Sequence, residues 1–301
     1  MWASFMDGTR AFALRNVYPA AAFRRTDPVA IGAGELTSAG CSGEVEAGGR
    51  SVRWRLSFEP RAEAEDVVPA PLRAIAALRR SGVALPQPSM RVSGALEVDG
   101  RPTDLDGAPG AQGHLWARER WLTYTWARCN AFAEDPSASV DLTAVRLPGG
   151  VQVPLYTFRS GGEVHRFQDP PWVVFSRSSP AAPTWHFSAA NAHLAIDGVV
   201  RGRPASSVLV AYQDSRGEEH RCSNTELAEM ELRVRARAFP GARWRPQATL
   251  TSGAACLEFC GQGVEQDIAN RLVTESAEGA GGRARAAGGP PSGPPRLVPG
   301  A

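Results

Sequence analysis

The stretch ELAEMELRVRARA (Glu226–Ala238) alternates between apolar and charged side chains from Glu229 onward. An alternation with a period of two predicts a β-strand that buries one face and exposes the other. The stretch SVRWRLSF (Ser51–Phe58) repeats the pattern and predicts a second strand of the same kind. The residues expected on the buried faces of these strands are Val52, Trp54, Leu56, Phe58, Met230, Leu232, Val234 and Ala236.

Further stretches with looser alternation lie between signals for tight turns. Strands are predicted at 90–100, 138–147, 151–158, 193–200 and 205–214, and turn sequences occur at 99–100, 148–150, 160–162, 197–198 and 214–217. Antiparallel strands over about 270 ordered residues exceed one small barrel of about eight strands, so we expect two stacked barrels or sandwiches. The pattern alone leaves the choice between barrels and sandwiches open.

Two segments depart from the strand pattern. APLRAIAALRRSG (70–82) has apolar residues at helical spacing, with Pro71 suited to a first turn and Gly82 to a stop, and predicts one short helix. The segment 274–301 is rich in Gly, Ala, Pro and Arg without periodicity, so it buries too little apolar surface to order itself. We expect this segment to form a disordered C-terminal tail.

The composition excludes several classes of function. The chain has 301 residues, of which 43% are hydrophobic, and this suits one large or two ordinary globular domains. A formal net charge of +2 gives no electrostatic footprint for nucleic acid or acidic membranes. No apolar run approaches the length of a membrane span, so no integral membrane association is expected.

The cysteines and the N-terminal residues predict a cytoplasmic location. The cysteines are odd in number, scattered and without a C-x-x-C pair, which is typical of reduced thiols: Cys41, Cys129, Cys222, Cys256 and Cys260. Cys256 and Cys260 lie four apart on one face of a predicted strand, as small core residues do. Residues 1–17 lack a basic leader followed by an apolar core, so we expect neither a signal peptide nor a disulfide.

The segment GHLWARERWLTYTWARCNAF (Gly113–Phe132) mixes aromatic and polar residues and holds three of the eight Trp residues. As one strand, its second half places alternate residues on a common face: Leu122, Tyr124, Trp126, Arg128, Asn130 and Phe132. Both faces mix aromatic and polar groups, which suits a barrel wall around an occupied interior. A sheet edge with arginine stems along aromatic rings is the alternative interpretation.

Ionisable residues close to this segment suggest acid–base chemistry: Asp104, Asp106, His114 and Glu119. A carboxyl group in an apolar cavity has a raised pKa and can donate a proton, and Trp and Tyr faces can stabilise a cation. This combination suits protonation of an alkene, whereas turn positions are the alternative for Asp104 and Asp106. His114 would either hold a buried loop by hydrogen bonding or shuttle a proton.

The sequence shows no motif for a metal or an organic cofactor. His186 and His193 lack the spacing of metal ligands. We find no serine elbow, phosphate loop or dinucleotide-binding fingerprint. We therefore expect neither a metal site nor a cofactor.

The stretch GAQGHLWARERWLTYTWARCNAF (110–132) resembles the central motif of bacterial proteins related to tocopherol cyclase. That motif runs approximately Gly-His-Asn-Trp-Gly, and a Trp-rich strand follows that ends in His-Cys-Asn and an aromatic residue. The matching residues are Gly113, His114, Trp116, Trp126, Cys129, Asn130 and Phe132. The chain departs from the motif at Leu115, Ala117 and Arg128, which stand where the motif has Asn, Gly and His.

The resemblance implies a fold of two tandem lipocalin-like antiparallel β-barrels, which we place at 1–110 and 111–273. The relatives include carotenoid hydratases of the hydroxyneurosporene synthase type. They act on isoprenoid or polyketide substrates held in an apolar cavity, and the resemblance implies a similar ligand for this chain.

These observations lead to the hypothesis that the protein binds a hydrophobic terpenoid or polyketide-like molecule and hydrates or cyclises an alkene without a cofactor. His114 or Glu119 would be the acid, and the ligand would contact Trp116, Trp121, Tyr124, Trp126, Arg128 and Asn130. The alternative is a non-catalytic carrier or chaperone-like protein with the same cavity. A carboxyl group or His facing the cavity would favour the enzyme, and a purely apolar lining would favour the carrier.

Overall fold

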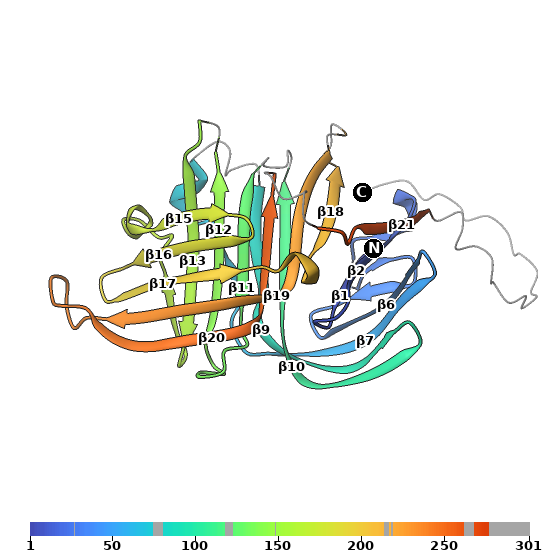
Figure 1. The fold of residues 1–301 in the computed structure, drawn as a ribbon, viewed down its shortest axis with the longest axis horizontal. Helices are drawn as coiled ribbons and strands as arrows, with labels where there is room; N and C mark the ends of the chain where they lie inside the picture. Colours follow the sequence, from blue (N-terminus) through green and yellow to red (C-terminus); the bar gives the residue numbers. More distant parts are fainter. Residues whose placement is uncertain are drawn as a thin grey trace, which may run out of the picture.

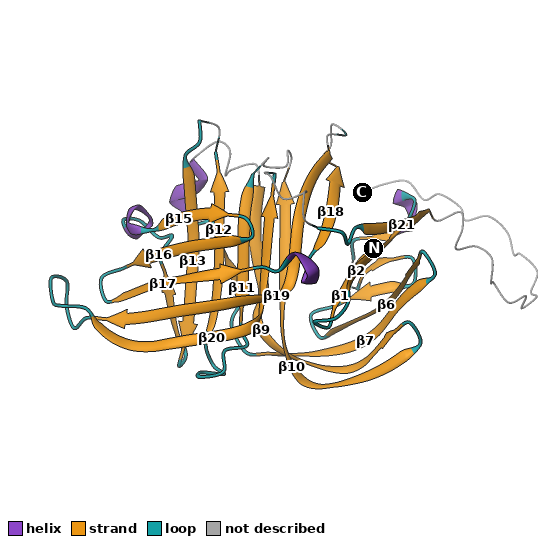
Figure 2. Cartoon of the chain, in the orientation of Figure 1, coloured by secondary structure: helices purple, strands orange, loops and turns teal. Residues whose placement is uncertain are grey.

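The computed structural model describes residues 1–26, 28–74, 81–117, 123–147, 149–213, 217, 219–261 and 268–276. This part of the chain is all-β, as predicted, and most of its strands form curled antiparallel sheets (Figure 1; Figure 2). Its helical elements are short 3-10 turns: η1 (Ala20–Ala22), η2 (Ala70–Ala74), η3 (Trp172–Phe175) and η4 (Pro204–Ser206). None of these turns is long and apolar enough to cross a membrane.

The helix predicted at 70–82 differs from the structure at both of its ends. Its first residues form the 3-10 turn η2, and residues 75–80 lie outside the described residues. Gly82 belongs to a strand and pairs with Trp116, so it does not act as a helix stop. Most of the predicted tail, residues 277–301, likewise lies outside the described residues.

An eight-stranded sheet has the strand order β10-β9-β7-β6-β5-β4-β3, with β8 paired to β9. Its strands are β3 (Phe23–Arg24), β4 (Val29–Ile31), β5 (Gly34–Leu36), β6 (Gly40–Ala47), β7 (Arg50–Pro60), β8 (Glu65–Asp66), β9 (Ser81–Val98) and β10 (Arg101–Ala117). The alternation predicted for β7 is confirmed, because its apolar residues from Val52 to Phe58 are more buried than the polar residues between them. β7 pairs with β9 only from Met90 to Val98, so the β9–β10 hairpin extends beyond it.

A ten-stranded sheet has the strand order β14-β13-β12-β11-β20-β19-β17-β16-β15, with β18 paired to β19. Its strands are β11 (Tyr124–Cys129), β12 (Ser139–Arg146), β13 (Gln152–Ser160), β14 (Glu163–Arg166), β15 (Arg177–Ala181), β16 (Thr184–Ala190), β17 (Leu194–Arg201), β18 (Val208–Gln213), β19 (Glu219–Ala236) and β20 (Arg245–Cys260). The sheet curls into a half-barrel.

The half-barrel has two layers, one with strands β11–β13 and one with strands β15–β17. The long strands β19 and β20 extend into both. One end of β19 pairs with β18 and the other with β17. In Figure 1 the outer ends of β19 and β20 and strands β15–β17 cross in front of the upright strands β11–β13, and the largest apolar core fills the space between. Met230, Leu232 and Val234 are buried there, as their alternation predicts, whereas Ala236 is half-buried.

A three-stranded sheet joins the two ends of the described chain. Its strands are β1 (Trp2–Met6), β2 (Ala11–Val17) and β21 (Leu272–Ser276). β1 is antiparallel to β2, and β21 runs parallel to β2 on its other side. Phe12 and Leu14 on one face of β2 pack against the eight-stranded sheet, while Ala11 and Ala13 on the other face pack against β18.

The predicted domain boundaries do not coincide with breaks in the structure. The boundary between 1–110 and 111–273 falls inside β10, which is one continuous strand. The tail predicted from 274 begins inside β21, because that strand continues to Ser276. Residues of both predicted domains therefore share two sheets, the eight-stranded and the three-stranded one, and two of the apolar cores.

The expectation of five free thiols is wrong. Cys222 on β19 and Cys260 on β20 are direct partners in the strand register, with Cα atoms 4.1 Å apart, and they form a disulfide. Cys41, Cys129 and Cys256 are free. The paired cysteines lie 38 residues apart in sequence, so only the pairing of β19 with β20 brings them together. Cysteine usage therefore no longer argues for a reducing compartment.

We predict that titration of the denatured, non-reduced protein counts three thiols, since two of the five cysteines are paired. Replacing both Cys222 and Cys260 by Ala should lower the free energy of unfolding by roughly 4 kcal/mol, because a crosslink across 38 residues restricts the unfolded chain. Urea denaturation of the double variant measures this loss. A count of five thiols in the wild-type protein would contradict the assignment.

Candidate functional site

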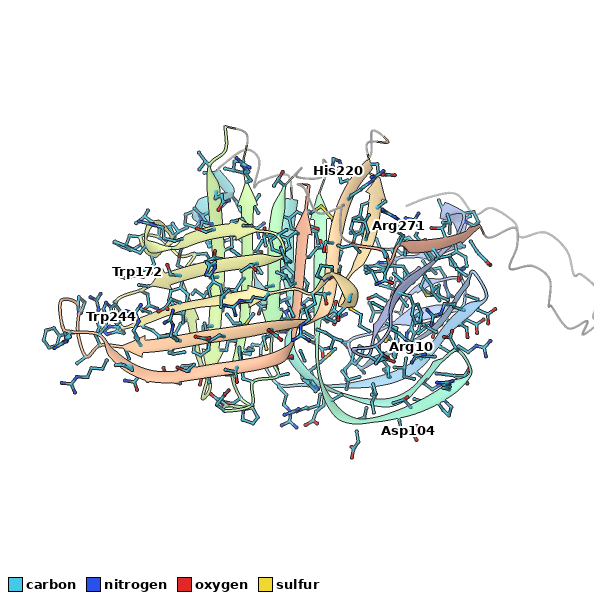
Figure 3. All side chains as sticks on the ribbon, in the orientation of Figure 1. Arg10, Asp104, Trp172, His220, Trp244 and Arg271 are labelled. Atoms are coloured by element: carbon cyan, nitrogen blue, oxygen red, sulfur yellow. A yellow bond between two sulfur atoms is a disulfide. The ribbon has the colours of Figure 1, made fainter. Side chains whose placement is uncertain are left out.

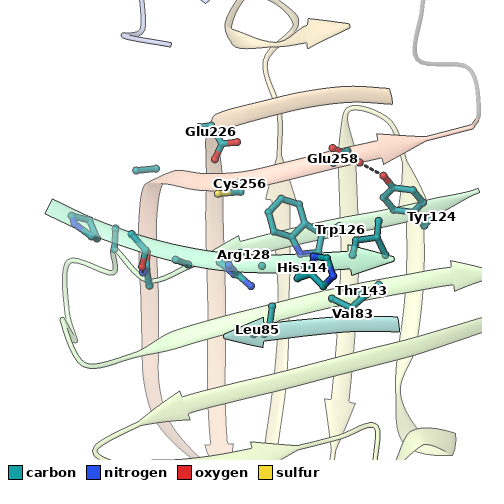
Figure 4. A pocket seen from close by; sticks show the side chains of 18 of the residues that line it. Val83, Leu85, His114, Tyr124, Trp126, Arg128, Thr143, Glu226, Cys256 and Glu258 are labelled. Carbon is teal, nitrogen blue, oxygen red and sulfur yellow. Dashed lines mark hydrogen bonds between the residues drawn. The ribbon is translucent and has the colours of Figure 1, made fainter. Parts of the chain in front are cut away.

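A cavity of about 620 Å³ lies where the two large sheets meet. Its walls come from β9 and β10 of the eight-stranded sheet and from β11, β12, β18, β19 and β20 of the ten-stranded sheet (Figure 4). The volume is in the range of pockets that hold drug-sized molecules. The larger apolar side chains of the wall are Val83, Leu85, Pro109, Leu115, Trp126 and Val145.

The floor of the cavity is built from residues that stand side by side on β12, β11 and β20. Backbone pairing aligns these strands in three rows: Asp141–Arg128–Cys256, Thr143–Trp126–Glu258 and Val145–Tyr124–Cys260. All members of the rows except Asp141 and Cys260 line the cavity. Because side chains alternate along a strand, the intervening residues Ala127, Leu142 and Leu257 lie on the opposite face and belong to the main core. The same strands thus form core on one face and cavity on the other.

The predicted common face of the aromatic segment is confirmed at its centre. Tyr124, Trp126, Arg128 and Asn130 all line the cavity. The strand itself is shorter than expected, because β11 ends at Cys129. Phe132 therefore leaves the common face and packs in the main core.

The remaining predicted site residues have different outcomes. His114 lies on β10 and lines the cavity, from which its side chain is accessible, so it does not sit in a buried loop. Trp116 also belongs to β10, but its side chain is outside the described part of the chain. Glu119 and Trp121 lie wholly outside the described residues.

Asp104 and Asp106 occupy strand positions in β10 and not the turn that the sequence suggested. Both are exposed, and neither lines the cavity. Figure 3 shows Asp104 at the lower edge of the molecule, on the part of β10 that pairs with the outer half of β9. These two aspartates therefore take no part in the site.

Glu226 is a cavity residue that the sequence analysis missed. Thr225 pairs with Leu257 and Ala228 pairs with Ala255, so two residues of β19 stand opposite the single residue Cys256. Such a β-bulge redirects a side chain and changes which face the following residues occupy. Here it turns Glu226 into the cavity. In the sequence this bulge corresponds to a shift in the alternation of buried residues along β19. The shift can be recognised only once the buried face of the strand is known.

Glu226 is an exposed residue of the cavity wall, and Figure 4 shows its carboxyl group above Cys256. Partial desolvation raises the pKa of Glu226, while a hydrogen bond from the Cys256 thiol and the positive charge of Arg128 partly oppose the rise. Burial also raises the pKa of Cys256 well above its ordinary value, and the neighbouring Glu226 adds to that effect. Both groups therefore tend to keep their protons, and Cys256 is not suited to act as a thiolate nucleophile.

Glu258 is the second carboxyl group of the cavity, and it is held firmly. The Tyr124 hydroxyl donates a hydrogen bond to its Oε1, and Asn224 Nδ2 donates to its Oε2 at 3.3 Å. The side chains of Glu258 and Asn224 are buried. Both oxygens of Glu258 thus accept hydrogen bonds from the protein, which leaves Glu226 as the more available acid.

A chain of buried ion pairs leads away from the cavity floor. Arg128 Nε donates to Asp141 Oδ1, and Arg159 Nη1 donates to Asp141 Oδ2 at 2.7 Å. Arg159 also pairs with Glu65, whose Oε1 accepts a hydrogen bond from the Thr157 hydroxyl at 2.9 Å. The four charged residues are buried and alternate in sign, so each charge has an opposite neighbour.

The fold and the site define an all-β protein whose curled sheets enclose a cavity of mixed apolar and polar character. No protein-family model, curated protein or solved structure matches the chain. Within the described residues, no group of three or more His, Cys, Asp or Glu side chains is arranged to hold a metal ion.

We predict that Asp141→Asn lowers the free energy of unfolding by about 3–5 kcal/mol, because it leaves buried Arg128 and Arg159 without their shared counter-charge. Urea denaturation measures the loss. The control is Glu44→Gln, which breaks an exposed ion pair with Arg53 and should cost about 0–1 kcal/mol. Equal losses in the two variants would show that burial of the network is unimportant.

A second prediction follows from the raised pKa of Glu226. Between its ordinary value of 4.5 and its raised folded value, the folded protein holds a proton that the unfolded chain releases. The wild-type protein should therefore lose stability as the pH rises through this window, and Glu226→Gln should not. Denaturation at a series of pH values gives the difference between the two proteins. Glu229→Gln, an exposed position on the same strand, controls for loss of a carboxylate.

The free energy of unfolding of Glu226→Gln relative to the wild-type protein should increase as the pH rises above 4.5. A constant difference would contradict the raised pKa of Glu226.

Proposed function

We propose that the cavity binds a hydrophobic small molecule of terpenoid or polyketide type and that Glu226 protonates an alkene in it, which leads to hydration or cyclisation without a cofactor. The cavity volume and its apolar wall support the binding of such a ligand. The tandem lipocalin-like architecture of the tocopherol cyclase relatives is part of the same proposal. It is supported by the resemblance of the segment 110–132 and by the curled antiparallel sheets.

The observation that carries the proposal is the Glu226 carboxyl group in the wall of a cavity that also presents aromatic rings and aliphatic side chains. A carboxylic acid that is poorly solvated keeps its proton to higher pH and can deliver it to a bound substrate. Glu226 is added to the two acids predicted from the sequence, His114 and Glu119, of which Glu119 lies outside the described residues. His114 lines the same cavity and remains the second candidate for proton transfer.

The proposed reaction needs only groups of this chain and water. Glu226 gives its proton to one carbon of a double bond, and the other carbon becomes a cation. The ring faces of Trp126 and Tyr124, which both line the cavity, would stabilise that cation. Water or a second double bond of the ligand then supplies an electron pair, and the product returns a proton to the Glu226 carboxylate.

The competing function is a carrier that binds the same class of ligand without changing it. It is favoured by the fixed hydrogen bonds of Glu258, which give that carboxyl group a structural role. The enzyme is favoured by Glu226, whose carboxyl group has one side-chain donor, the Cys256 thiol, within the part of the chain that the structure describes. The two functions differ in whether the ligand gains a proton on carbon.

We predict that the protein binds geranylgeraniol and that Trp126→Ala weakens the affinity by about tenfold or more, as expected for removal of a central aromatic contact. Equilibrium dialysis measures the affinity. The matched control is Trp244→Ala, because Trp244 stacks on Arg237 at the outer end of the large sheet and does not line the cavity (Figure 3). An unchanged affinity in Trp126→Ala would place the ligand elsewhere.

The same ligand separates the enzyme from the carrier when it is incubated with the protein in D₂O. The wild-type protein should give a product with deuterium on carbon, and Glu226→Gln should bind the ligand but transfer no deuterium. Mass spectrometry of the extracted ligand measures the transfer. Binding by the wild-type protein without any deuterium transfer would support the carrier.

A further inference from the structure

Arg128 has a buried N–H group that the ion-pair network leaves unused. Its Nε bonds to Asp141, but its Nη2 is shielded from solvent and has no hydrogen-bond partner within the described part of the chain. The Arg128 side chain is 7% exposed and forms part of the cavity wall. Buried donors are nearly always paired, because an unpaired one loses its hydration without compensation. A molecule in the cavity can supply the acceptor that Nη2 lacks once the cavity wall shifts enough to uncover this atom.

We propose, on the basis of the function proposed above, that the ligand carries a neutral carbonyl oxygen that accepts a hydrogen bond from Arg128 Nη2. The assignment narrows the ligand class to a ketone or enone with an apolar body.

The charges around Arg128 favour a neutral acceptor over a carboxylate. The charge of Arg128 is already matched by Asp141, and the second oxygen of Asp141 is bound by Arg159. A ligand carboxylate at Arg128 would therefore find no uncompensated positive charge, whereas a neutral carbonyl oxygen needs only the unused N–H group.

The neighbours of Arg128 suit a flat, conjugated ligand. The Arg128 guanidinium lies 5.6 Å from the centre of the Trp126 ring, and Trp126 is the next residue along the cavity face of β11. In Figure 4 Arg128 and Trp126 lie between Cys256 and Leu85, which come from different sheets. A carbonyl bound at Arg128 would place its attached unsaturated carbons against the Trp126 ring, where stacking is favourable.

This subsite also orients the ligand relative to the proposed acid. Arg128 and Cys256 are register partners, and Glu226 stands at the bulge opposite Cys256 on the next strand. Two strand spacings separate the backbones of Arg128 and Glu226, which is roughly 10 Å. A carbonyl at Arg128 therefore leaves a more distant double bond near Glu226, so the positive charge formed on protonation lies away from the guanidinium.

The test compares three ligands that share a naphthalene ring: 2-acetylnaphthalene, 2-isopropenylnaphthalene and 2-naphthoate. The first two differ in that a carbonyl oxygen is replaced by a methylene group of similar shape, and the third carries a carboxylate. Isothermal titration calorimetry measures their affinities for the wild-type protein. We expect the ketone to bind about tenfold to a hundredfold more tightly than the alkene, as for a hydrogen bond to a charged donor.

Arg128→Met should reduce the preference for the ketone to within about twofold, because it keeps the apolar stem but removes the donor. Arg146→Met, at the exposed end of β12, should keep the full preference. If Arg128→Met does not fold, the affinities of the ketone and the alkene for the wild-type protein still test the carbonyl assignment.

Equal affinities for the ketone and the alkene would overturn the carbonyl assignment but leave the proposed function intact. Tightest binding of 2-naphthoate would overturn it as well and identify an anion site. Binding of none of the three would overturn the carbonyl assignment, and the geranylgeraniol measurement would then decide on the proposed function separately.

Discussion

The pleat of three neighbouring strands is the constraint on which the site depends. β11 pairs with β12 on one side and β20 on the other, and each strand sends alternate side chains to opposite faces. One face contributes Ala127, Leu142 and Leu257 to the main core, so the other face is committed to the cavity. A slip of one residue in either pairing would exchange core and cavity, which means that the core packing also fixes the site.

Polar groups on the cavity face are tolerated because nearly all of them are paired within the wall. Asp141 serves two arginines, and Glu258 accepts hydrogen bonds from Tyr124 and Asn224. Asn130 donates to the backbone oxygen of Gly110 at 2.7 Å and so holds β10 beside the end of β11. A buried network of this kind is stable only when its members are satisfied, and departures from that rule mark positions where a ligand can contribute. Arg128 Nη2 is such a position, and Glu226 stands in the same cross-strand row.

The sequence predicted the features that follow from local periodicity. The buried positions in β7 and β19 and the common face of Tyr124, Trp126 and Arg128 all follow from a two-residue repeat. Features that depend on pairing between distant strands were missed. The Cys222–Cys260 disulfide needs the register of β19 with β20, and the orientation of Glu226 needs the bulge in that same register. The C-terminal end of the helix expected at 70–82 differs for a related reason, since Gly82 is held by its pairing with β10.

The parallel pairing of β2 with β21 has a consequence for the way the molecule is made. Arg15 and Thr274 are register partners, and 259 residues separate them in the sequence. At about 5–20 residues per second, a ribosome needs roughly 13–50 s to synthesise the chain between them. During that time the β1–β2 hairpin exists without its parallel neighbour, and one hydrogen-bonding edge of β2 stays open. An open edge beside apolar residues such as Phe12 and Leu14 is a site for aberrant pairing with another nascent chain. Successful folding therefore depends on keeping this hairpin isolated until β21 is available.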